Sequence, residues 1–383
     1  MVPDAASLQG RARKLLPPEV YDYYAGGSGR EVTLRANLKA WRRVWLAPRV
    51  LRDVSVVDTA VSLLGTAVAT PVGVAPTAYH HMAHDEAELA TAAGAARAGA
   101  LFVLSTRSAR RIEDVAGVVA AGGGAWWFQV YVMRDRELTV GLVRRAAAAG
   151  AAALVLTADT PVVGRKRRAG LGRAVVGEAD FLVNLGPLAD RGRAEQAADV
   201  TAADIGWLAD ISGLPVVVKG VLRPDDALAC AAAGAAAIIV SNHGGRQLDS
   251  AIPTAWALPG VVAAVRASHG GLPVYVDGGI RSGLDVLAAL ALGARAVFVG
   301  RPVIWALACG GAEGVRDLLT GLTADLAHVM ALAGAASVAE VPAAALPADA
   351  PGLPADAPGL PADAPGLPAD APGPPAGAPG PGD

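Results

Sequence analysis

Short runs of apolar residues, most of them rich in β-branched side chains, recur through the middle of the chain. The runs are continuous rather than alternating, which is the pattern of parallel strands that are buried on both faces. Eight runs occupy residues 71–76, 100–106, 126–131, 153–159, 215–220, 237–242, 273–279 and 296–301. Ala-rich segments with helical spacing, such as 88–99 and 138–150, lie between most of them. The pattern predicts eight consecutive strand–helix units.

The spacing of the runs favours one closed architecture. Successive runs start 22 to 36 residues apart, which is the length of one strand–helix unit, except that 62 residues separate the starts of the fourth and fifth runs. Eight such units predict an α/β fold, a TIM (β/α)8 barrel with a helical extension before the first strand and an insertion after strand four. That insertion lies on the C-terminal face of the barrel, where barrel enzymes carry out their chemistry. A doubly wound sheet is the competing architecture.

The C-terminal end of the chain has a different composition. The heptad LPADAPG repeats four times from Leu346 through Gly373. Proline at this density removes backbone donors, and no bulky side chains are present to be buried. We therefore predict a folded domain over residues 1–342 and a disordered Pro/Ala-rich tail over 343–383. The tail is either a neutral extension or a spacer that docks a partner.

Charge and composition narrow the class of protein. The 383 residues are 53% hydrophobic, and 33 basic against 35 acidic residues give a net charge of −2, which argues against a nucleic-acid-binding surface. Two cysteines, Cys230 and Cys309, make no disulfide framework. The N-terminus has no apolar signal region, and no apolar run is long enough to span a bilayer. We expect a cytoplasmic protein without nucleic-acid or membrane partners.

Polar residues stand at the C-terminal end of every predicted strand. A purely structural barrel has no need of them, so on this fold the ring indicates an active site. Its members are Thr77, Ser105, Thr106, Gln129, Tyr131, Thr157, Asp159, Lys219, Asn242, His243, Asp277, Gly300 and Arg301.

The last two strands predict a phosphate site. Strand seven ends in DGGIRSG (277–283) and strand eight in GRP (300–302). Glycines let backbone N–H groups approach an anion, and the arginines add charge; tight turns with surface arginines are the alternative. No G-x-G-x-x-G opens a helix after a strand, so a nicotinamide site is not supported. A phosphate-bearing cofactor inside a barrel points to FMN, with Lys219 placed against negative charge that develops on the flavin.

The sequence SNHGGRQLD (241–249) carries the candidate catalytic residues. His243 can accept a proton near neutral pH, and Arg246 can bind a carboxylate through two hydrogen bonds. Asp159, at the end of strand four, is a candidate to stabilise the imidazolium, although a loop carboxylate is the plainer interpretation. Tyr131 and Tyr23 could donate hydrogen bonds to a substrate, although YDYY also fits an ordinary helical face.

Together these motifs carry a family resemblance. The chain resembles the FMN-dependent 2-hydroxy-acid oxidase and dehydrogenase family, which includes glycolate, lactate and mandelate oxidisers. The motifs that carry the resemblance are YDYYAGGSGR, APTAYHHMAH, FQVY, TADTP, VVVKG, SNHGGRQLD, VDGGIRSG and VGRPV. The resemblance runs from about Pro17 to Val341. It implies His243 as the base, Asp159 as its partner, Arg246 as a carboxylate ligand, and Tyr23 and Tyr131 as substrate-bonding tyrosines.

The resemblance also implies a set of FMN contacts. The flavin would be lined by the backbone of Pro76, Thr77 and Ala78. Its ring would be contacted by Ser105, Gln129 and Thr157, and its N1/C2 edge by Lys219. The ribityl chain and phosphate would be held by Asp277, Gly279, Arg281, Gly300 and Arg301. No metal is expected.

Some positions depart from the family pattern. Lys166 stands where the family has a second carboxylate-binding arginine, with Arg165 and Arg167 beside it, and lysine lacks the planar fork of arginine. Arg107 replaces an apolar pocket residue, so we expect it, with Val163, to shift the pocket away from glycolate. Tyr79 and the WALA run (305–308) are more similar to 4-hydroxymandelate oxidases than to plant-type glycolate oxidases.

The expected reaction is oxidation of an (S)-2-hydroxy acid, of mandelate-like structure, to the 2-oxo acid, with O2 reoxidising the flavin to give H2O2. The resemblance implies a homotetramer. Alternatives are a dehydrogenase that uses a quinone or another acceptor, an FMN isomerase, and a flavin-binding barrel with weak turnover that serves as an assembly module.

Overall fold

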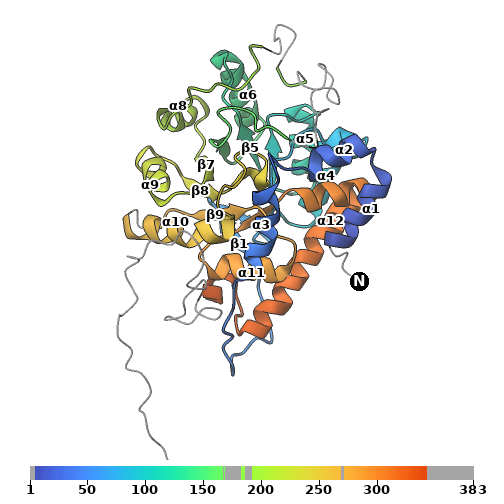
Figure 1. Cartoon of the computed structure of the whole chain (residues 1–383), viewed down its shortest axis with the longest axis vertical. Coiled ribbons are helices and arrows are strands. Elements are labelled where there is room, and N and C mark those ends of the chain that lie inside the picture. The colour runs from blue at the N-terminus through green and yellow to red at the C-terminus, as the bar shows by residue number, and fades with distance from the viewer. Residues whose placement is uncertain (1–4, 167, 169–182, 186–191, 269–270, 343–383) are drawn as a thin grey trace, which may run out of the picture.

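Eight parallel strands close into a barrel at the centre of the molecule (Figure 1). The computed structural model describes residues 5–166, 168, 183–185, 192–268 and 271–342. The strands are β3 (Val72–Val74), β4 (Phe102–Ser105), β5 (Trp126–Val130), β6 (Leu154–Thr157), β7 (Val216–Val221), β8 (Ala237–Val240), β9 (Val274–Asp277) and β10 (Val297–Val299). The pairing of β10 with β3, in register at Val297 and Val72, closes the ring. The predicted TIM barrel is therefore confirmed.

Burial of the strands explains their continuous apolar sequences. Every residue of the eight strands is buried except the half-buried Gly220 in β7. One face packs against the surrounding helices, and the other fills the barrel. Inside it, the rings of Trp127, Tyr275 and Phe298 pack with centroids 5.8–5.9 Å apart. The interior of the barrel is thus a packed core rather than a channel.

Helices cover the outside of the barrel in the order that the sequence predicts (Figure 1). They are α4 (Ala87–Arg97), α5 (Ile112–Ala121), α6 (Arg136–Ala148), α8 (Ala203–Ser212), α9 (Pro224–Ala232), α10 (Thr254–Ser268), α11 (Gly283–Ala291) and α12 (Arg301–Ala333). The backbone of α12 leaves helical geometry at Gly310 and Gly311, so the helix bends there. No helix in the described part of the chain is long and apolar enough to cross a bilayer.

The N-terminal residues form the predicted helical extension. It consists of α1 (Ala5–Leu15), α2 (Pro18–Ala25) and α3 (Val32–Trp41). Helix α3 is fixed to the C-terminal ends of the strands: Asn37 and Asn242 exchange amide hydrogen bonds of 2.8 Å, and the indole of Trp41 donates to Gly278 O at 2.8 Å. The extension therefore supplies residues to the same end of the barrel as the strand-end ring.

A short hairpin, β1 (Val61–Leu63) with β2 (Thr66–Val68), was not predicted. Leu63 and Val68 join the core cluster inside the barrel, so the hairpin covers that core from the N-terminal side. Two predictions lie largely or wholly outside the described residues: the insertion after strand four, of which 169–182 and 186–191 are not described, and the tail over 343–383.

Candidate active site

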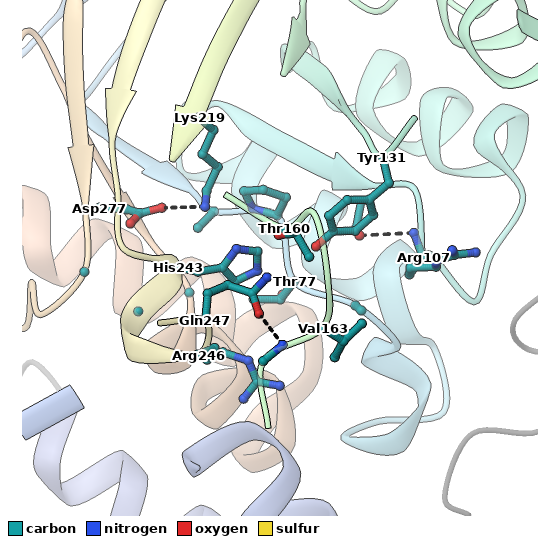
Figure 2. A pocket seen from close by; sticks show the side chains of 18 of the residues that line it. Thr77, Arg107, Tyr131, Thr160, Val163, Lys219, His243, Arg246, Gln247 and Asp277 are labelled. Atoms are coloured by element: carbon teal, nitrogen blue, oxygen red, sulfur yellow. Dashed lines mark hydrogen bonds and ion pairs between the residues drawn. The ribbon is translucent and has the colours of Figure 1, made fainter. Parts of the chain in front are cut away.

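A cavity of about 730 Å³ opens at the C-terminal ends of the strands. Its size is in the range of small-molecule and cofactor sites. Predicted site residues that line it are Tyr23, Pro76, Thr77, Ala78, Ser105, Arg107, Tyr131, Lys166, Lys219, His243, Arg246, Asp277, Gly279, Arg281, Gly300 and Arg301. Figure 2 shows residues from many of the strand ends converging on this space. Most of the predicted strand-end ring therefore meets at one cavity, and the members that do not line it are Thr106, Gln129, Thr157, Asp159 and Asn242.

His243 and Asp159 form a hydrogen-bonded pair in this site. His243 Nδ1 lies 2.9 Å from Asp159 Oδ1, which leaves the other ring nitrogen for the cavity. Burial lowers the pKa of His243 and outweighs the opposing effect of Asp159, so the imidazole is neutral at neutral pH and can accept a proton. Burial raises the pKa of Asp159, but His243 and Lys219 more than offset it and bring it to about 2. The pair is a neutral base beside a carboxylate.

The backbone at the base is unusual. His243 has a φ of +56°, and it is followed by Gly244 and Gly245, also at positive φ. A non-glycine residue in this region is strained, and such residues concentrate at functional sites. The amide of His243 donates to Ser241 Oγ at 3.0 Å, which helps to hold this conformation.

Arg246 and the two tyrosines surround the space next to His243. The Arg246 guanidinium lies 5.2 Å from the ring centre of Tyr23 and donates to Tyr23 O at 2.7 Å. Burial raises the pKa of Tyr23, with Arg246 and Arg107 partly opposing it, and burial and Asp159 raise that of Tyr131. Both phenols therefore stay protonated and can donate hydrogen bonds to a substrate.

The structure separates the two candidates for the second carboxylate ligand. Lys166 is half-buried and lines the cavity, whereas Arg165 is exposed and does not line it. The backbone causes this difference, because Gly29 N donates to Arg165 O at 3.0 Å and Ser28 forms an antiparallel bridge with Lys166. Burial, Arg246 and Arg301 lower the pKa of Lys166 to about 7. Arg167 lies outside the described residues.

Two half-buried arginines, Arg281 and Arg301, mark the predicted phosphate region. Burial lowers the pKa of Arg281 to about 10, and burial with the nearby Arg246 and Arg281 lowers that of Arg301 well below its ordinary value. Arg301 donates to the carbonyls of Tyr24, Gly244 and Gly26 at 2.9–3.0 Å. These contacts hold the guanidinium in place but supply no counter-charge, so the region favours a bound anion.

Glycine is required at the loop after β9. Gly279 has a φ of +91°, and a Cβ there would lie 2.6 Å from Asn37 O. The loop can therefore bring backbone N–H groups close to a ligand while α3 packs behind it. Helix α12 begins at Arg301, directly beside this loop region, and its N-terminus adds a favourable potential for an anion.

Lys219 is buried in the cavity wall at the end of β7. Its ammonium lies 3.3 Å from Asp277 Oδ2 and donates to Ser241 Oγ at 2.9 Å. Burial opposes its charge, but Asp277 and Asp159 more than compensate, so the pKa of Lys219 is raised. Lys219 is a fixed cation that cannot rotate away into solvent.

Gln129 and Thr157 do not line the cavity but lie directly behind its wall. Gln129 Nε2 donates to Thr157 Oγ1 at 2.9 Å, and Gln129 Oε1 accepts from Thr106 N at 3.1 Å and Ser105 Oγ at 3.2 Å. All four residues are buried. This network positions Ser105, which does reach the cavity.

Arg107 and Val163 both line the outer cavity. Arg107 is buried in the wall, and its Nη2 donates to Ala194 O at 2.6 Å, so it ties the wall to the segment that returns from the insertion. Val163 is 69% exposed at the mouth, beside the equally exposed Val162. Charged and apolar surfaces therefore both face the space beyond Tyr131.

Comparison with known proteins identifies this architecture. A family model described as FMN-dependent dehydrogenase matches residues 12–347. The chain belongs to this family. Glycolate oxidase 1 of Zea mays is 45% identical over 347 residues, with 87% of this chain and 92% of that protein covered. The 4-hydroxymandelate oxidase of Amycolatopsis orientalis is 44% identical over 345 residues, with 87% and 95% covered.

Solved structures agree with the sequence comparison. A crystal structure of mandelate oxidase is 44% identical, covers 89% of this chain and 97% of its own, and has a TM-score of 0.82. Another, of mandelate oxidase with benzoyl-formic acid, has a TM-score of 0.80 at the same identity and coverage. The resemblance to FMN-dependent 2-hydroxy-acid oxidases, the FMN cofactor and the oxidoreductase class are therefore confirmed.

The cavity fits FMN by the chemistry of its donors. The guanidinium groups of the half-buried Arg281 and Arg301 line the predicted phosphate region and have no carboxylate at bonding distance among the described residues. Lys219 supplies a further cation in the wall, and Asp277 Oδ1 is buried with no hydrogen-bond partner. An oxygen acceptor of this kind suits a hydroxyl group of the ribityl chain. When bound, FMN supplies a two-electron acceptor.

Sequence reasoning missed the side chains that fasten the site loops together. Gln247, Ser28 and Asp249 each cross-link segments that lie far apart in sequence: Ser28 Oγ donates to Arg246 O, and Asp249 accepts from Arg30 N at 2.8 Å and Thr33 N at 3.1 Å. The only available signal was their place within or beside the SNHGGRQLD and YDYYAGGSGR motifs.

Proposed function

We propose that this family member oxidises an (S)-2-hydroxy acid of mandelate-like structure to the 2-oxo acid, with O2 as the acceptor and H2O2 as the second product. The observation that carries the proposal is that His243, hydrogen-bonded to Asp159, lines the same cavity as Arg246. A neutral base, a fixed carboxylate and a cation for the substrate carboxylate are the groups that this oxidation needs.

Each side chain has a defined task. Arg246 and Lys166 bind the carboxylate, and Tyr23 and Tyr131 donate hydrogen bonds to the acid. His243 accepts the proton that leaves the substrate, and Asp159 stabilises the resulting imidazolium. Two electrons leave the substrate with that change, whether the proton comes from oxygen or from carbon, and FMN held in this cavity would supply the acceptor for them. Lys219 stabilises the negative charge that appears in its part of the wall.

The outer cavity supports an aromatic acid over glycolate. Val162 and Val163 present apolar surface at the mouth, and Arg107 adds a polar side chain to the same lining. The relatives include proteins named 4-hydroxymandelate oxidase and mandelate oxidase. A side chain of phenyl size would cover the valines, whereas glycolate would leave them in contact with water.

An anaerobic flavin-reduction screen tests the proposal. Purified yellow enzyme is mixed without oxygen with glycolate, (S)-lactate, (S)-mandelate and (S)-4-hydroxymandelate, and (R)-mandelate is the matched control. We expect the aromatic (S)-acids to bleach the flavin fastest, and H2O2 to form in equal amount with the oxo acid in air. Bleaching by none of the acids contradicts the activity. Bleaching without H2O2 favours the quinone-linked alternative.

Assembly and compartment are part of the same proposal. We infer a homotetramer in the cytoplasm from the family resemblance and from the composition of the chain. Light scattering on the purified protein tests the first, and fractionation of source cells tests the second.

A further inference from the structure

Gln247 lies four residues after His243, and its side-chain amide bridges two loops of the site. Its Oε1 accepts from Gly164 N at 2.9 Å, and its Nε2 donates to Asp159 O at 3.1 Å and Val162 O at 3.2 Å. Figure 2 shows this amide reaching across to the neighbouring loop. Reversing the amide would set a donor against a donor and an oxygen against two carbonyls, so its orientation is fixed.

The loop that Gln247 holds joins two residues of the proposed machinery. It runs from Asp159, which pairs with the base, to Lys166 in the cavity wall. Its far end is fastened independently, through the Ser28–Lys166 bridge. Among the described residues, the three bonds of Gln247 add to the Asp159–His243 bond in tying the first half of this loop to the His243 loop.

The two loops are in direct contact where Gln247 crosses. A Cβ built on Gly164 would lie 2.6 Å from Arg246 O and 2.9 Å from the Cα of Gln247. Only glycine permits this approach, and no space remains for water between the backbones. Gln247 therefore acts where the two loops are already closely packed, so that a small shift of one loop displaces the other.

We propose that Gln247 is a positioning residue that fixes Asp159 against His243 and keeps the loop of Lys166 in the cavity wall. The proposal rests on the proposed function for the roles of those residues. Asp159 needs such support: its Oδ2 is buried without a hydrogen-bond partner, and its Oδ1 is shared between His243 and Thr160, at 2.9 and 3.2 Å. Gln247 holds its backbone carbonyl.

A displaced Asp159 has a measurable electrostatic effect on the base. The charged groups that act on His243 are Asp159, Lys219 and Arg246. Asp159 raises the pKa of His243, whereas burial and the two cations lower it. If Asp159 moves away, the lowering effects remain, and the pKa of His243 falls further. A purely structural role for Gln247 predicts no such change.

The test compares Gln247→Leu with a matched control, Gln9→Leu. Gln9 is a half-buried glutamine on α1 that donates one bond of 3.0 Å to the hydroxyl of Tyr21, and it does not line the cavity. We expect kcat/KM of Gln247→Leu to fall at least about tenfold, because a 1 Å misplacement in a catalytic site can cost about 100-fold. The control should stay within about twofold, and both variants should retain FMN.

The second readout needs no turnover. The rate at which diethylpyrocarbonate modifies His243, followed by peptide mass spectrometry across pH, reports the titration of that imidazole. We expect the midpoint to move to lower pH in Gln247→Leu and to stay unchanged in Gln9→Leu. Gln247→Met should behave like Gln247→Leu, because a thioether cannot donate to the two carbonyls and adds no charge near His243.

The outcomes separate the two proposals. An unshifted midpoint in both Gln247 variants overturns the positioning role, even if activity falls. The midpoint can also shift in the variants although none of the hydroxy acids reduces the flavin of the wild-type enzyme. That result supports the positioning role and contradicts the proposed function. If Gln247→Leu loses FMN or melts below the assay temperature and Gln247→Met does not, the midpoint of Gln247→Met decides.

Discussion

Replacing Lys166 by arginine should change how substrate binding depends on pH. The ammonium of Lys166 is half-buried beside Arg246 and Arg301, and burial together with these two cations lowers its pKa to about 7. Bound phosphate near Arg301 would raise this value, so the transition falls at or above pH 7. As pH rises through it, Lys166 loses its proton, and its contribution to binding a carboxylate is lost.

The expected size follows from one charge-assisted hydrogen bond. Such bonds are worth about 1.5–3 kcal/mol, or about 10- to 100-fold in affinity. We therefore expect KM to rise at least about tenfold between pH 7 and pH 9 in the wild type. Arginine remains protonated throughout, so Lys166→Arg should keep KM nearly constant over the same range.

The assay is steady-state oxidation of (S)-mandelate at half-unit intervals from pH 5.5 to 9.5. The acidic limb of kcat/KM should belong to His243, whose pKa is lowered from its ordinary value, and it should be the same in both proteins. Only the basic limb should disappear in Lys166→Arg. A basic limb at the same pH in both proteins would refute the assignment, because it would then come from another group.

Three further predictions follow from the site and the tail. His243→Ala should slow anaerobic flavin reduction at least about 100-fold while FMN stays bound, because general base catalysis is typically worth about 10²–10⁴-fold. Asp159→Asn should slow flavin reduction by a smaller factor. Stopped-flow absorbance of the flavin measures both rates. Arg107→Leu should change the ranking of mandelates against aliphatic acids in kcat/KM, and an unchanged ranking would remove Arg107 from substrate selection. Truncation after Val341 should leave turnover within about twofold, since the repeat offers no flavin ligand or base; a larger loss would show that the tail packs on the barrel.

The barrel could be predicted because its signal is local. Each strand is a short run buried on both faces, so its apolar residues stand next to one another in sequence. The strand-end residues were predictable for the same reason, since the barrel brings the ends of all eight strands to one face. The β1–β2 hairpin was missed because three-residue strands leave almost no pattern.

Side-chain direction in the loops could not be predicted. Arg165 and Lys166 are adjacent cations, and only the bridge between Ser28 and Lys166 decides which of them enters the cavity. The bonds of Gln247 likewise join residues that are 83 to 88 positions apart. Such contacts depend on how two loops meet in space, and neither loop carries a periodic pattern that reveals its partner.

The charges of the cavity indicate a phosphate-bearing cofactor and a substrate with a carboxylate, but they do not indicate which 2-hydroxy acid the enzyme oxidises. Lys219 is balanced by Asp277 at 3.3 Å, but the guanidinium groups of Arg246, Arg281 and Arg301 donate to backbone carbonyls and to no carboxylate among the described residues. A phosphate at one end and a substrate carboxylate at the other are the anions that complete this arrangement. Every 2-hydroxy acid has that carboxylate, so the cations cannot distinguish one acid from another. Discrimination must therefore come from the outer cavity.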